Sequence, residues 1–226
     1  MVKVKRKPFE EIVDSISRYE RVLNIGCGGC ASVCLGGGQR EVQILNQELR
    51  LYFEKNQITK QIDAYIVERA CNKKYFLNLD DVIKNGNYDV IITMCCSAGT
   101  QLLAEIYNSI PIFPAVNTIA IGIDRDIGLY EEKCRACGNC IIGYTGGICP
   151  ITRCAKSLFN GPCGGTNKGM CEINPNIPCA WCEIYKRLKA QNRLEDILKI
   201  YPPVDWKNQM PRTIVQYGYE KRYTKK

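Results

Sequence analysis

Clustered cysteines are the residues of this chain whose type and spacing point most directly to chemistry. Cys27, Cys30 and Cys34 fall within eight residues of the glycine-rich stretch IGCGGCASVCLGGG. Thiolates are strong ligands for zinc and iron–sulfur clusters, and glycines let a loop fold around a cluster while its backbone N–H groups point at the sulfides. We therefore expect these three thiols to bind metal, with a fourth ligand supplied from elsewhere in the chain.

The fourth ligand is expected at Cys96, because the strand expected at Tyr88–Met94 ends there, beside the strand that precedes Cys27. Cys95 is next to it in sequence but is expected to point away, and Cys71 is the less favoured candidate. We interpret both as core thiols, since free Cys is among the most buried residue types. A phosphate-binding loop is the competing interpretation of the glycine-rich turn, but no Gly-Lys-Ser/Thr follows it.

A second group of nine thiols lies between positions 134 and 182. It begins with Cys134-x2-Cys137-x2-Cys140-x8-Cys149-Pro150, which resembles the ferredoxin run C-x2-C-x2-C…C-P with a longer last gap. Its other members are Cys154, Cys163, Cys171, Cys179 and Cys182. Nine thiols suffice for two four-cysteine sites with one left over, and the spacing does not assign the thiols to one site or the other.

Zinc competes with iron–sulfur clusters for these thiols, because all-cysteine tetrahedral zinc sites with two-residue spacings are common. The C-x2-C-x2-C spacing favours a cubane, since zinc knuckles usually bring their ligands in pairs. Zinc is a closer alternative for the last set of thiols, which comprises Cys163, Cys171, Cys179 and Cys182. We expect two to three [4Fe–4S] clusters, with zinc as the alternative at one site.

The rest of the composition limits the catalytic mechanisms and the compartment that we expect. The chain of 226 residues has fifteen cysteines and no histidine, which removes the commonest general base and any Ser-His or Cys-His nucleophile pair. The first residues lack the apolar region of a secretory signal, and no apolar run approaches the roughly 18 residues of a membrane span. We therefore expect a cytoplasmic protein with reduced thiols and no transmembrane segment.

The formal net charge of +8 raises the question of nucleic-acid binding. The basic residues gather at the ends, in Lys3–Lys7 and Lys221–Lys226, with no patch of interleaved aromatic residues, so we interpret them as solvated tails and expect no nucleic-acid partner. The acidic residues between positions 124 and 132 are interpreted as a solvated linker rather than as a general acid–base pair. They are Asp124, Asp126, Glu131 and Glu132.

Alternating strands and helices must position the first cysteine group. Short apolar strands are expected at Val22–Ile25, Asp63–Val67 and Tyr88–Met94, and a further extended piece from Pro111. Helices are expected at Gln39–Lys55, around Asp80–Gly86 and after Gly99 as far as Asn108. This alternation predicts an α/β fold, in which residues 1–128 form an open Rossmann- or flavodoxin-like parallel sheet covered by helices.

The cysteine-bearing turns fall where such sheets bind ligands. The turns at Gly26–Gly38 and Cys95–Gly99 each follow a strand directly, and ligand sites lie beyond the carboxyl ends of strands. Residues 129–182 are expected to form a loop-rich, cluster-binding domain that needs metal to define its fold. Residues 183–226 are expected to add one helix over Glu183–Lys199 and a basic tail.

Several long strings resemble a known family, the methylenetetrahydrofolate reductase C-terminal family, which is the small iron–sulfur subunit of the reductase in acetogenic and related anaerobes. The strings are IGCGGCASVCLGGGQREV, CSAGTQ, CRACGNC, GGICPITRCAKSLFNGPCGG and CEINPNIPCAW. The resemblance covers about residues 21–198. It implies [4Fe–4S] clusters in this chain and a flavin-bearing TIM-barrel partner subunit, with FMN or FAD in that partner only, which reduces methylenetetrahydrofolate to methyltetrahydrofolate. Further electron-transfer subunits or a ferredoxin are additional partners on this interpretation.

Carried over by position, the resemblance gives a set of twelve metal-ligating cysteines. They are Cys27, Cys30, Cys34, Cys96, Cys134, Cys137, Cys140, Cys149, Cys154, Cys163, Cys171 and Cys179. Cys95 and Cys182 lie outside the family's pattern. The implied function is electron transfer to or from the partner's flavin, without catalysis by this chain. The alternatives are a structural module, with zinc or redox-silent clusters, that supports assembly of the partner, and an enzyme that binds a nucleotide or corrinoid at the sheet edge.

Overall fold

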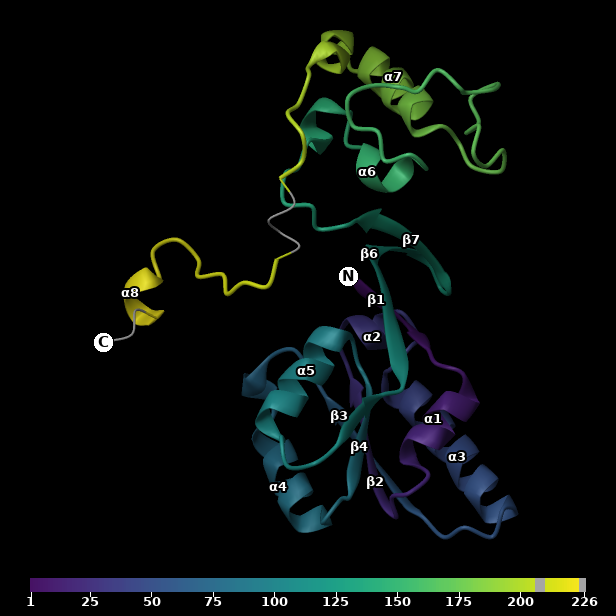
Figure 1. Ribbon diagram of the computed structural model, residues 1–226, viewed down its shortest axis with the longest axis vertical. Helices are drawn as coiled ribbons and strands as arrows, with labels where there is room; N and C mark the ends of the chain where they lie inside the picture. The colour runs from purple at the N-terminus through teal and green to yellow at the C-terminus, as the bar shows by residue number, and fades with distance from the viewer. Residues whose placement is uncertain (206–209, 224–226) are drawn as a thin grey trace. The chain divides into compact units, whose positions relative to one another are not determined.

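The computed structural model describes residues 1–205 and 210–223. The chain divides into two compact units, Met1–Glu132 (unit 1) and Lys133–Lys226 (unit 2). The expected divisions were at residues 128 and 182. The two units are drawn in Figure 1 and are described separately below.

Unit 1 is built on a four-stranded parallel sheet, which confirms the α/β class expected from the sequence (Figure 1). Its strands are β2 (Arg21–Cys27), β3 (Gln61–Val67), β4 (Val90–Met94) and β5 (Ile112–Pro114). They lie in the order β3-β2-β4-β5. The strand order therefore reverses between β2 and β4, which is the position where open α/β sheets bind ligands.

Helices cover both faces of this sheet. They are α1 (Phe9–Ile16), the short α2 (Cys30–Val33), α3 (Gln39–Lys55), α4 (Leu77–Gly86) and α5 (Ser97–Ile106), with the 3-10 turn η1 (Lys73–Tyr75) before α4. Figure 1 shows α1 and α3 on one side of the sheet and α4 and α5 on the other. Helix α3 has the bounds expected from its apolar periodicity, because Val42, Leu45 and Leu49 recur on one face and are fully buried.

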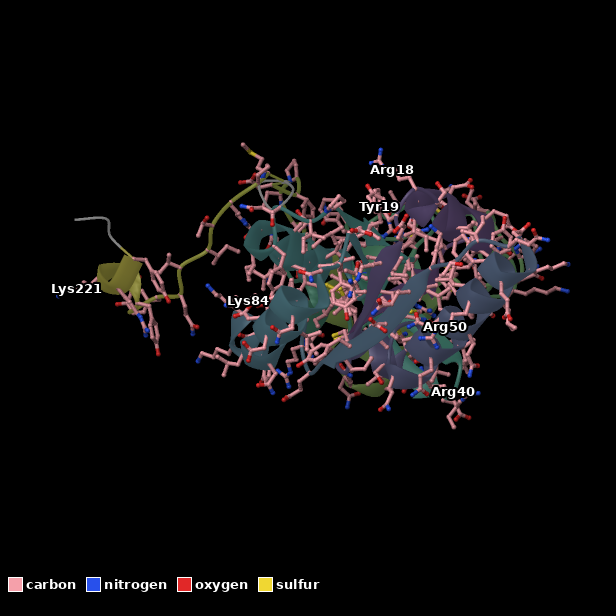
Figure 2. All side chains as sticks on the ribbon, turned by 90° about the horizontal axis from the view of Figure 1, so that it is seen from below. Arg18, Tyr19, Arg40, Arg50, Lys84 and Lys221 are labelled. Atoms are coloured by element: carbon pink, nitrogen blue, oxygen red, sulfur yellow. The ribbon has the colours of Figure 1, made fainter. Side chains whose placement is uncertain are left out.

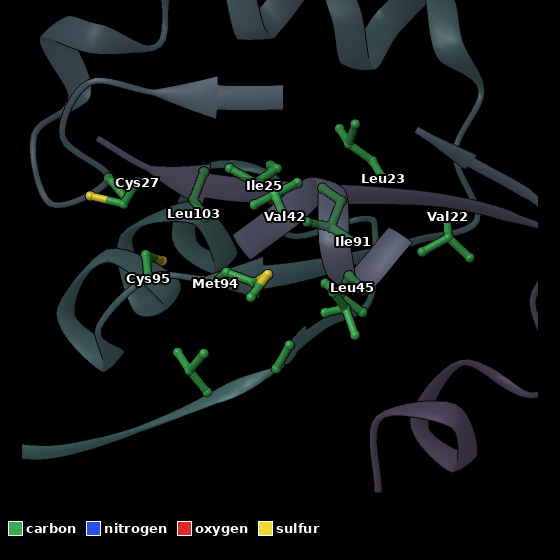
Figure 3. Packing of buried hydrophobic residues seen from close by; sticks show 14 of the residues in the cluster. Val22, Leu23, Ile25, Cys27, Val42, Leu45, Ile91, Met94, Cys95 and Leu103 are labelled. Carbon is green, nitrogen blue, oxygen red and sulfur yellow. The ribbon is translucent and has the colours of Figure 1, made fainter. Parts of the chain in front are cut away.

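The strands of this sheet are apolar on both faces because helices cover both faces. All residues of β4 are buried. Figure 3 shows how β2 and β4 pack between α3 and α5, with Leu23, Ile25, Val42, Leu45, Ile91, Met94 and Leu103 among the labelled side chains. This core is large and requires no metal for its packing.

Unit 1 also contains a three-stranded sheet that the sequence did not lead us to expect. Its strands are β1 (Val2–Arg6), β6 (Val116–Asp126) and β7 (Leu129–Cys134), in the order β1-β6-β7. The interpretation of Lys3–Lys7 as a solvated tail is wrong, because β1 pairs antiparallel with β6. The interpretation of the acidic residues between positions 124 and 132 as a linker is also wrong, because they lie on the β6–β7 hairpin, where Arg125 and Glu131 form an ion pair of 3.0 Å.

Unit 2 has few regular elements, as expected for a segment rich in Gly and Cys. It contains the 3-10 turn η2 (Ile142–Tyr144), α6 (Pro150–Arg153), α7 (Ala180–Ala190), η3 (Leu194–Leu198) and α8 (Glu220–Tyr223). A small core of Ile148, Trp181, Ile184 and Leu188 packs against α7. The last residues of the expected basic tail, 224–226, lie outside the described residues.

The prediction of a single helix over Glu183–Lys199 is wrong. The chain leaves α7 after Ala190, and Asn192 adopts a φ of 53°, in the left-handed region that ends helices. The helix also starts earlier than expected, at Ala180. The division expected at residue 182 therefore falls inside α7.

The surface of unit 1 carries dispersed charge. Figure 2 shows the exposed side chains of Arg18, Arg40 and Lys84 projecting from separate parts of this unit. Among residues 1–205 and 210–223, no helix combines the length and apolar character needed to cross a membrane.

Candidate metal centres

Five thiols of unit 2 line one cavity of about 390 Å³. They are Cys154, Cys163, Cys171, Cys179 and Cys182. The spacing predicted metal ligands in this segment but did not group them. The cavity brings four members of the expected ligand set to one place, with Cys182 as a fifth thiol in the wall. An all-thiol donor set suits either an iron–sulfur cluster or a structural zinc ion.

Backbone hydrogen bonds bring the distant parts of this loop to the cavity. The N–H of Cys171 donates to the carbonyl of Ile177 at 3.0 Å, and the N–H of Cys179 donates to the carbonyl of Gly169 at 2.8 Å. These two bonds fold residues 169–179 back on themselves. As a result Cys171 and Cys179, which are well separated in sequence, enter the same cavity wall.

Two of the cysteine turns point a backbone donor at the cysteine sulfur. The N–H of Gly165 lies 3.4 Å from Cys163 Sγ, and the N–H of Ala136 lies 3.3 Å from Cys134 Sγ. Gly164 makes the first of these turns with a φ of 81°, a conformation open to glycine without steric cost. Backbone N–H groups directed at cysteine sulfurs are a common feature of loops that hold iron–sulfur clusters.

Cys179 is the N-cap residue of α7. Burial by itself raises the pKa of the Cys179 thiol, but the polar groups of Cys182, Trp181 and Thr166 near its sulfur outweigh burial and lower the pKa from its ordinary value. The position therefore favours a thiolate, which is the form that a metal ligand takes.

Charged side chains at the cavity are mainly cationic. Arg153, Lys156 and Lys186 line it together with one carboxylate, Glu172. Glu172 pairs with Lys156 and lies 3.5 Å from the Cys163 thiol, which donates to it. A cluster held by four thiolates carries net negative charge, so the surplus of cations suits such a group.

The remaining cysteines of unit 2 do not line this cavity. They are Cys134, Cys137, Cys140 and Cys149. Cys149 is the N-cap residue of α6, and the hydroxyl of Thr152 lies 3.3 Å from the carbonyl of Lys133 and 3.4 Å from that of Cys149. Thr152 thus ties the start of α6 to the residue before Cys134, which supports a second set made of the ferredoxin-like run.

In unit 1, thiols from β2 and β4 meet at the carboxyl edge of the parallel sheet. Figure 3 shows Cys27 and Cys95 at the same end of their strands. Burial, and to a lesser degree the charges of Cys27 and Cys96, raise the pKa of Cys95 to about 12. Cys95 is 1% exposed and lies 3.5 Å from the hydroxyl of Thr100, which confirms that it is a core thiol. It nevertheless lies near Cys27 rather than remote from it.

The other thiols of unit 1 face different surroundings. Cys34 is buried, and its sulfur accepts a hydrogen bond of 3.4 Å from the N–H of Val4 on β1. Cys30 is exposed and Cys96 is half-buried. The expectation that Cys71 is a core thiol is wrong: Cys71 is exposed in the turn after β3, next to the buried Ala70.

The glycine-rich turn after β2 gives no support to a phosphate site. The N–H of Gly38, at the N-terminus of α3, donates to Glu41 Oε2 at 3.0 Å, so a carboxylate of the helix itself already takes this donor. A Cβ on Gly37 would lie 1.7 Å from the carbonyl oxygen of Met94. This turn is packed directly against β4, with no space between the two backbones.

Within the described ranges, no three Cys, Asp or Glu side chains are arranged so that they could hold one metal ion. The twelve cysteines taken from the sequence therefore stay a predicted ligand set. Four of them line the cavity in unit 2. Thr152 contacts the carbonyls of both Cys149 and Lys133, the residue before Cys134. In unit 1, Cys27 and Cys96 both lie near Cys95, whereas Cys34 contacts Val4 on β1.

Comparison with known proteins gives one match. Residues 113–207 match a family model described as Methylene-tetrahydrofolate reductase C terminal. The match contains every cysteine of unit 2 and confirms the resemblance seen in the strings CRACGNC, GGICPITRCAKSLFNGPCGG and CEINPNIPCAW. Neither the curated proteins nor the solved structures gave a match.

Proposed function

From the relation of residues 113–207 to methylenetetrahydrofolate reductases, we propose that this chain is the iron–sulfur electron-transfer subunit of such a reductase complex. It passes electrons to or from the flavin of a partner subunit, and that partner reduces methylenetetrahydrofolate to methyltetrahydrofolate. The chain itself contributes no catalytic residue, which is in keeping with its lack of histidine.

The observation that carries this proposal is the thiol-lined cavity of unit 2. Cys154, Cys163, Cys171 and Cys179 line it together with three cationic side chains, and the backbone N–H of Gly165 points at the sulfur of Cys163. Iron–sulfur clusters are held by four thiolates, and hydrogen bonds to the sulfurs are among the features that set their potentials. The type and number of thiols in the lining therefore suit a [4Fe–4S] cluster, and binding would draw them closer together than they lie in this structure.

The second cluster of unit 2 is assigned to the ferredoxin-like run. Its ligands are Cys134, Cys137, Cys140 and Cys149. The N–H of Ala136 lies 3.3 Å from Cys134 Sγ, a contact that suits a cluster ligand. A third site in unit 1 would take Cys27, Cys30, Cys34 and Cys96, and the contact between Cys34 and β1 makes it the weakest of the three groups. When bound, such clusters supply transfer of single electrons.

A structural module is the second candidate, and the chemistry of the same cavity favours it. Four thiolates in tetrahedral arrangement also make a structural zinc site, which would stabilise the loops of unit 2 without carrying electrons. The two functions differ in whether the bound metal changes oxidation state.

The deciding experiment measures iron, acid-labile sulfide and zinc per chain in protein purified without oxygen, followed by electron paramagnetic resonance after dithionite reduction. We expect about eight to twelve irons with matching sulfide and the signal of reduced cubanes, the content of two to three four-iron clusters. Zinc with little sulfide would reject the electron-transfer function and leave the structural one.

Two variants assign the clusters to their ligands. Cys163→Ala should lose the cluster of the cavity alone, and Cys137→Ala should lose that of the ferredoxin-like run alone, so that each variant loses about four irons. Cys95→Ala is the matched control, because Cys95 is a buried thiol outside the predicted ligand set. If either ligand variant lost all iron at once, the two sites would not be independent.

A further inference from the structure

Cys71 is an exposed thiol that the predicted ligand set leaves out, and it lies in the turn that follows β3. This turn is closed by a hydrogen bond of 3.2 Å from the N–H of Asn72 to the carbonyl of Arg69. The side chain of Asn72 accepts a further hydrogen bond of 3.1 Å from the N–H of Lys74 at the start of η1. Local hydrogen bonds therefore fix the backbone on both sides of Cys71.

The turn after β3 lies across the carboxyl end of β2, where Cys27 is found. Strand β2 lies between β3 and β4, and Cys27 pairs with Val67, the last residue of β3. The N–H of Gly28 extends this pairing by donating to the carbonyl of Val67 at 2.8 Å. The same turn reaches the helix after β4, because a Cβ on Gly99 in the first turn of α5 would lie 2.7 Å from the Cβ of Ala70. A contact between these two elements spans the end of the strand between them.

Three more thiols lie on the neighbouring turns. Cys27 ends β2, Cys30 begins α2, and Cys96 is the N-cap residue of α5. A Cβ on Gly29 would lie 3.6 Å from the Cys27 sulfur and 3.6 Å from a carbonyl oxygen of the turn after β3. Figure 3 shows Cys27 at the same end of the sheet as Cys95, the residue before Cys96. The turns after β2, β3 and β4 thus bring four thiols to the edge where open α/β sheets bind ligands.

The turn after β3 also carries a surplus of cations. Within residues 68–74, Arg69, Lys73 and Lys74 outnumber the one carboxylate, Glu68. Arg69 reaches the turn between Cys27 and Cys30, since its Cγ would lie 3.8 Å from a Cβ on Gly29. A cluster held by four thiolates carries net negative charge, which these cations would partly offset.

Cys34, the remaining member of the predicted set in unit 1, has the contacts of a core thiol. Its side chain is 6% exposed. Its sulfur accepts a hydrogen bond of 3.4 Å from the N–H of Val4 and lies 3.5 Å from the carbonyl of Ala31, to which the thiol donates. Deprotonation to bind metal would remove that donated bond inside the core. Cys34 is therefore less suited to a metal than the exposed Cys71.

We propose that the metal centre of unit 1 is held by Cys27, Cys30, Cys71 and Cys96, with Cys34 as a thiol of the core. The inference rests on the proposed function for the identity of the metal, a [4Fe–4S] cluster, and replaces one ligand of the third site described there. No three thiols in the described ranges are arranged to share one ion, so binding has to draw the four sulfurs together. Cys30 and Cys71 are exposed, and their side chains can turn towards a cluster without displacing the core.

The test compares Cys71→Ala and Cys34→Ala with the wild type in the full chain, purified without oxygen. Iron, acid-labile sulfide and zinc are measured per chain, and circular dichroism checks that each variant is folded. We expect Cys71→Ala to lose about four irons with matching sulfide, and Cys34→Ala to retain the wild-type content. Cys71→Ala removes an exposed side chain, so a loss of iron in this variant does not come from a disrupted core.

Alkylation of the wild type gives a second measurement, which decides the matter if Cys34→Ala does not fold. Iodoacetamide is applied before and after removal of the metal with a chelator, and mass spectrometry locates the modified thiols. Cys71 should be protected while metal is bound and modified after its removal. Cys34 should stay unmodified in both states, because it is buried in the core of unit 1. Modification of Cys71 at the same rate in both states would overturn the inference.

The outcomes separate this inference from the proposed function. Full iron in Cys71→Ala, or loss of about four irons in a folded Cys34→Ala, would overturn the ligand set, while the proposed function would stand through the clusters of unit 2. If the wild type held zinc with little sulfide and Cys71→Ala lost about one zinc, the four ligands would stand and the electron-transfer function would be overturned.

Discussion

At the scale of the residue, the surroundings of each sulfur distinguish two kinds of cysteine. Cys95 is almost fully buried, and burial raises the pKa of its thiol to about 12. Cys179 is also partly buried, which by itself raises the pKa of its thiol, but nearby polar groups outweigh burial and lower it. The two thiols therefore differ in the polar groups near the sulfur rather than in burial alone.

The same reasoning applies to a tyrosine of unit 1 and predicts a dependence of stability on pH. Tyr88 donates a hydrogen bond of 3.0 Å to Asp63. Burial first, and then this hydrogen bond and the charge of Asp63, raise the pKa of Tyr88 to about 12. The unfolded value is about 10, so the neutral phenol stabilises the folded state fully below pH ~10, and this contribution is lost as the pH rises towards 12.

Replacing Tyr88 with Phe should therefore matter less at high pH. We expect the difference in free energy of unfolding between wild type and Tyr88→Phe to shrink between pH ~9 and pH ~11.5, as measured by urea denaturation at each pH. A difference that stays constant across this interval would show that the phenol of Tyr88 ionises equally in both states.

At the scale of the element, the turn between β2 and α3 is fixed by close contact with β4. A Cβ at Gly37 would lie 1.7 Å from the backbone oxygen of Met94, whereas a Cβ at Gly28 in the same turn would meet nothing closer than 3.5 Å. Gly37→Ala must therefore displace backbone and should lower the free energy of unfolding by about 2 kcal/mol or more. Gly28→Ala is the control and should change it little; equal effects in urea denaturation would contradict the packing argument.

Helix α7 connects the small core of unit 2 to the thiol-lined cavity. Leu188 is fully buried against Ile148, Trp181 and Ile184, and the helix begins next to Cys179. Leu188→Ala should lower the stability of unit 2 by about 3 kcal/mol and speed the loss of metal to a chromogenic chelator. The exposed Lys189→Ala on the same helix is the control. If both variants released metal at the same rate, the core would not support the site.

The elements that were predicted correctly from the sequence are those whose pattern of apolar residues is uninterrupted. The runs in β2 and β4 are apolar because both faces of that sheet are covered, and the spacing in α3 follows one buried face. β1 was missed although Val2 and Val4 alternate with Lys3 and Lys5, because its high charge masked the two-residue period of a half-buried strand. Likewise β6 buries only Val116 and Gly122, so its pattern is weak.

The sequence singled out the candidate cysteines, because metal ligands recur at short fixed intervals, but it did not show how they group in space. Their role as ligands stays a prediction. The cavity depends on contacts such as those of Cys171 with Ile177 and Cys179 with Gly169, which no local pattern signals. The hydrogen bond from the N–H of Val4 to the sulfur of Cys34 depends on strand β1, which the sequence did not predict.

At the scale of the whole molecule, the two units differ in what holds them together. Unit 1 has an extensive apolar core between its helices and its sheet, whereas the cluster around α7 in the described part of unit 2 holds four buried side chains. If unit 2 binds the proposed clusters, so loop-rich a segment with so small a core should gain much of its folding free energy from them. Unit 1 should accordingly be stable without metal, and unit 2 should not.

Removal of metal tests this difference directly. After treatment with a chelator under reducing conditions, limited proteolysis should cut residues 133–205 while residues 1–132 resist, and mass spectrometry of the fragments locates the cuts. Circular dichroism should retain the signal of the α/β unit. Cuts distributed evenly over both units would contradict independent stabilisation.

The pairing of β1 with β6 has a consequence for how the chain is made. The first strand, Val2–Arg6, finds its partner only when Val116–Asp126 has left the ribosome. Nine cysteines, from Cys134 to Cys182, are translated after that partner. Since domains fold as units in the order of synthesis, the α/β unit can close before the second cysteine group is complete. On the proposed function, insertion of the clusters into unit 2 is then the last step of biogenesis, on a chain whose other half is already folded.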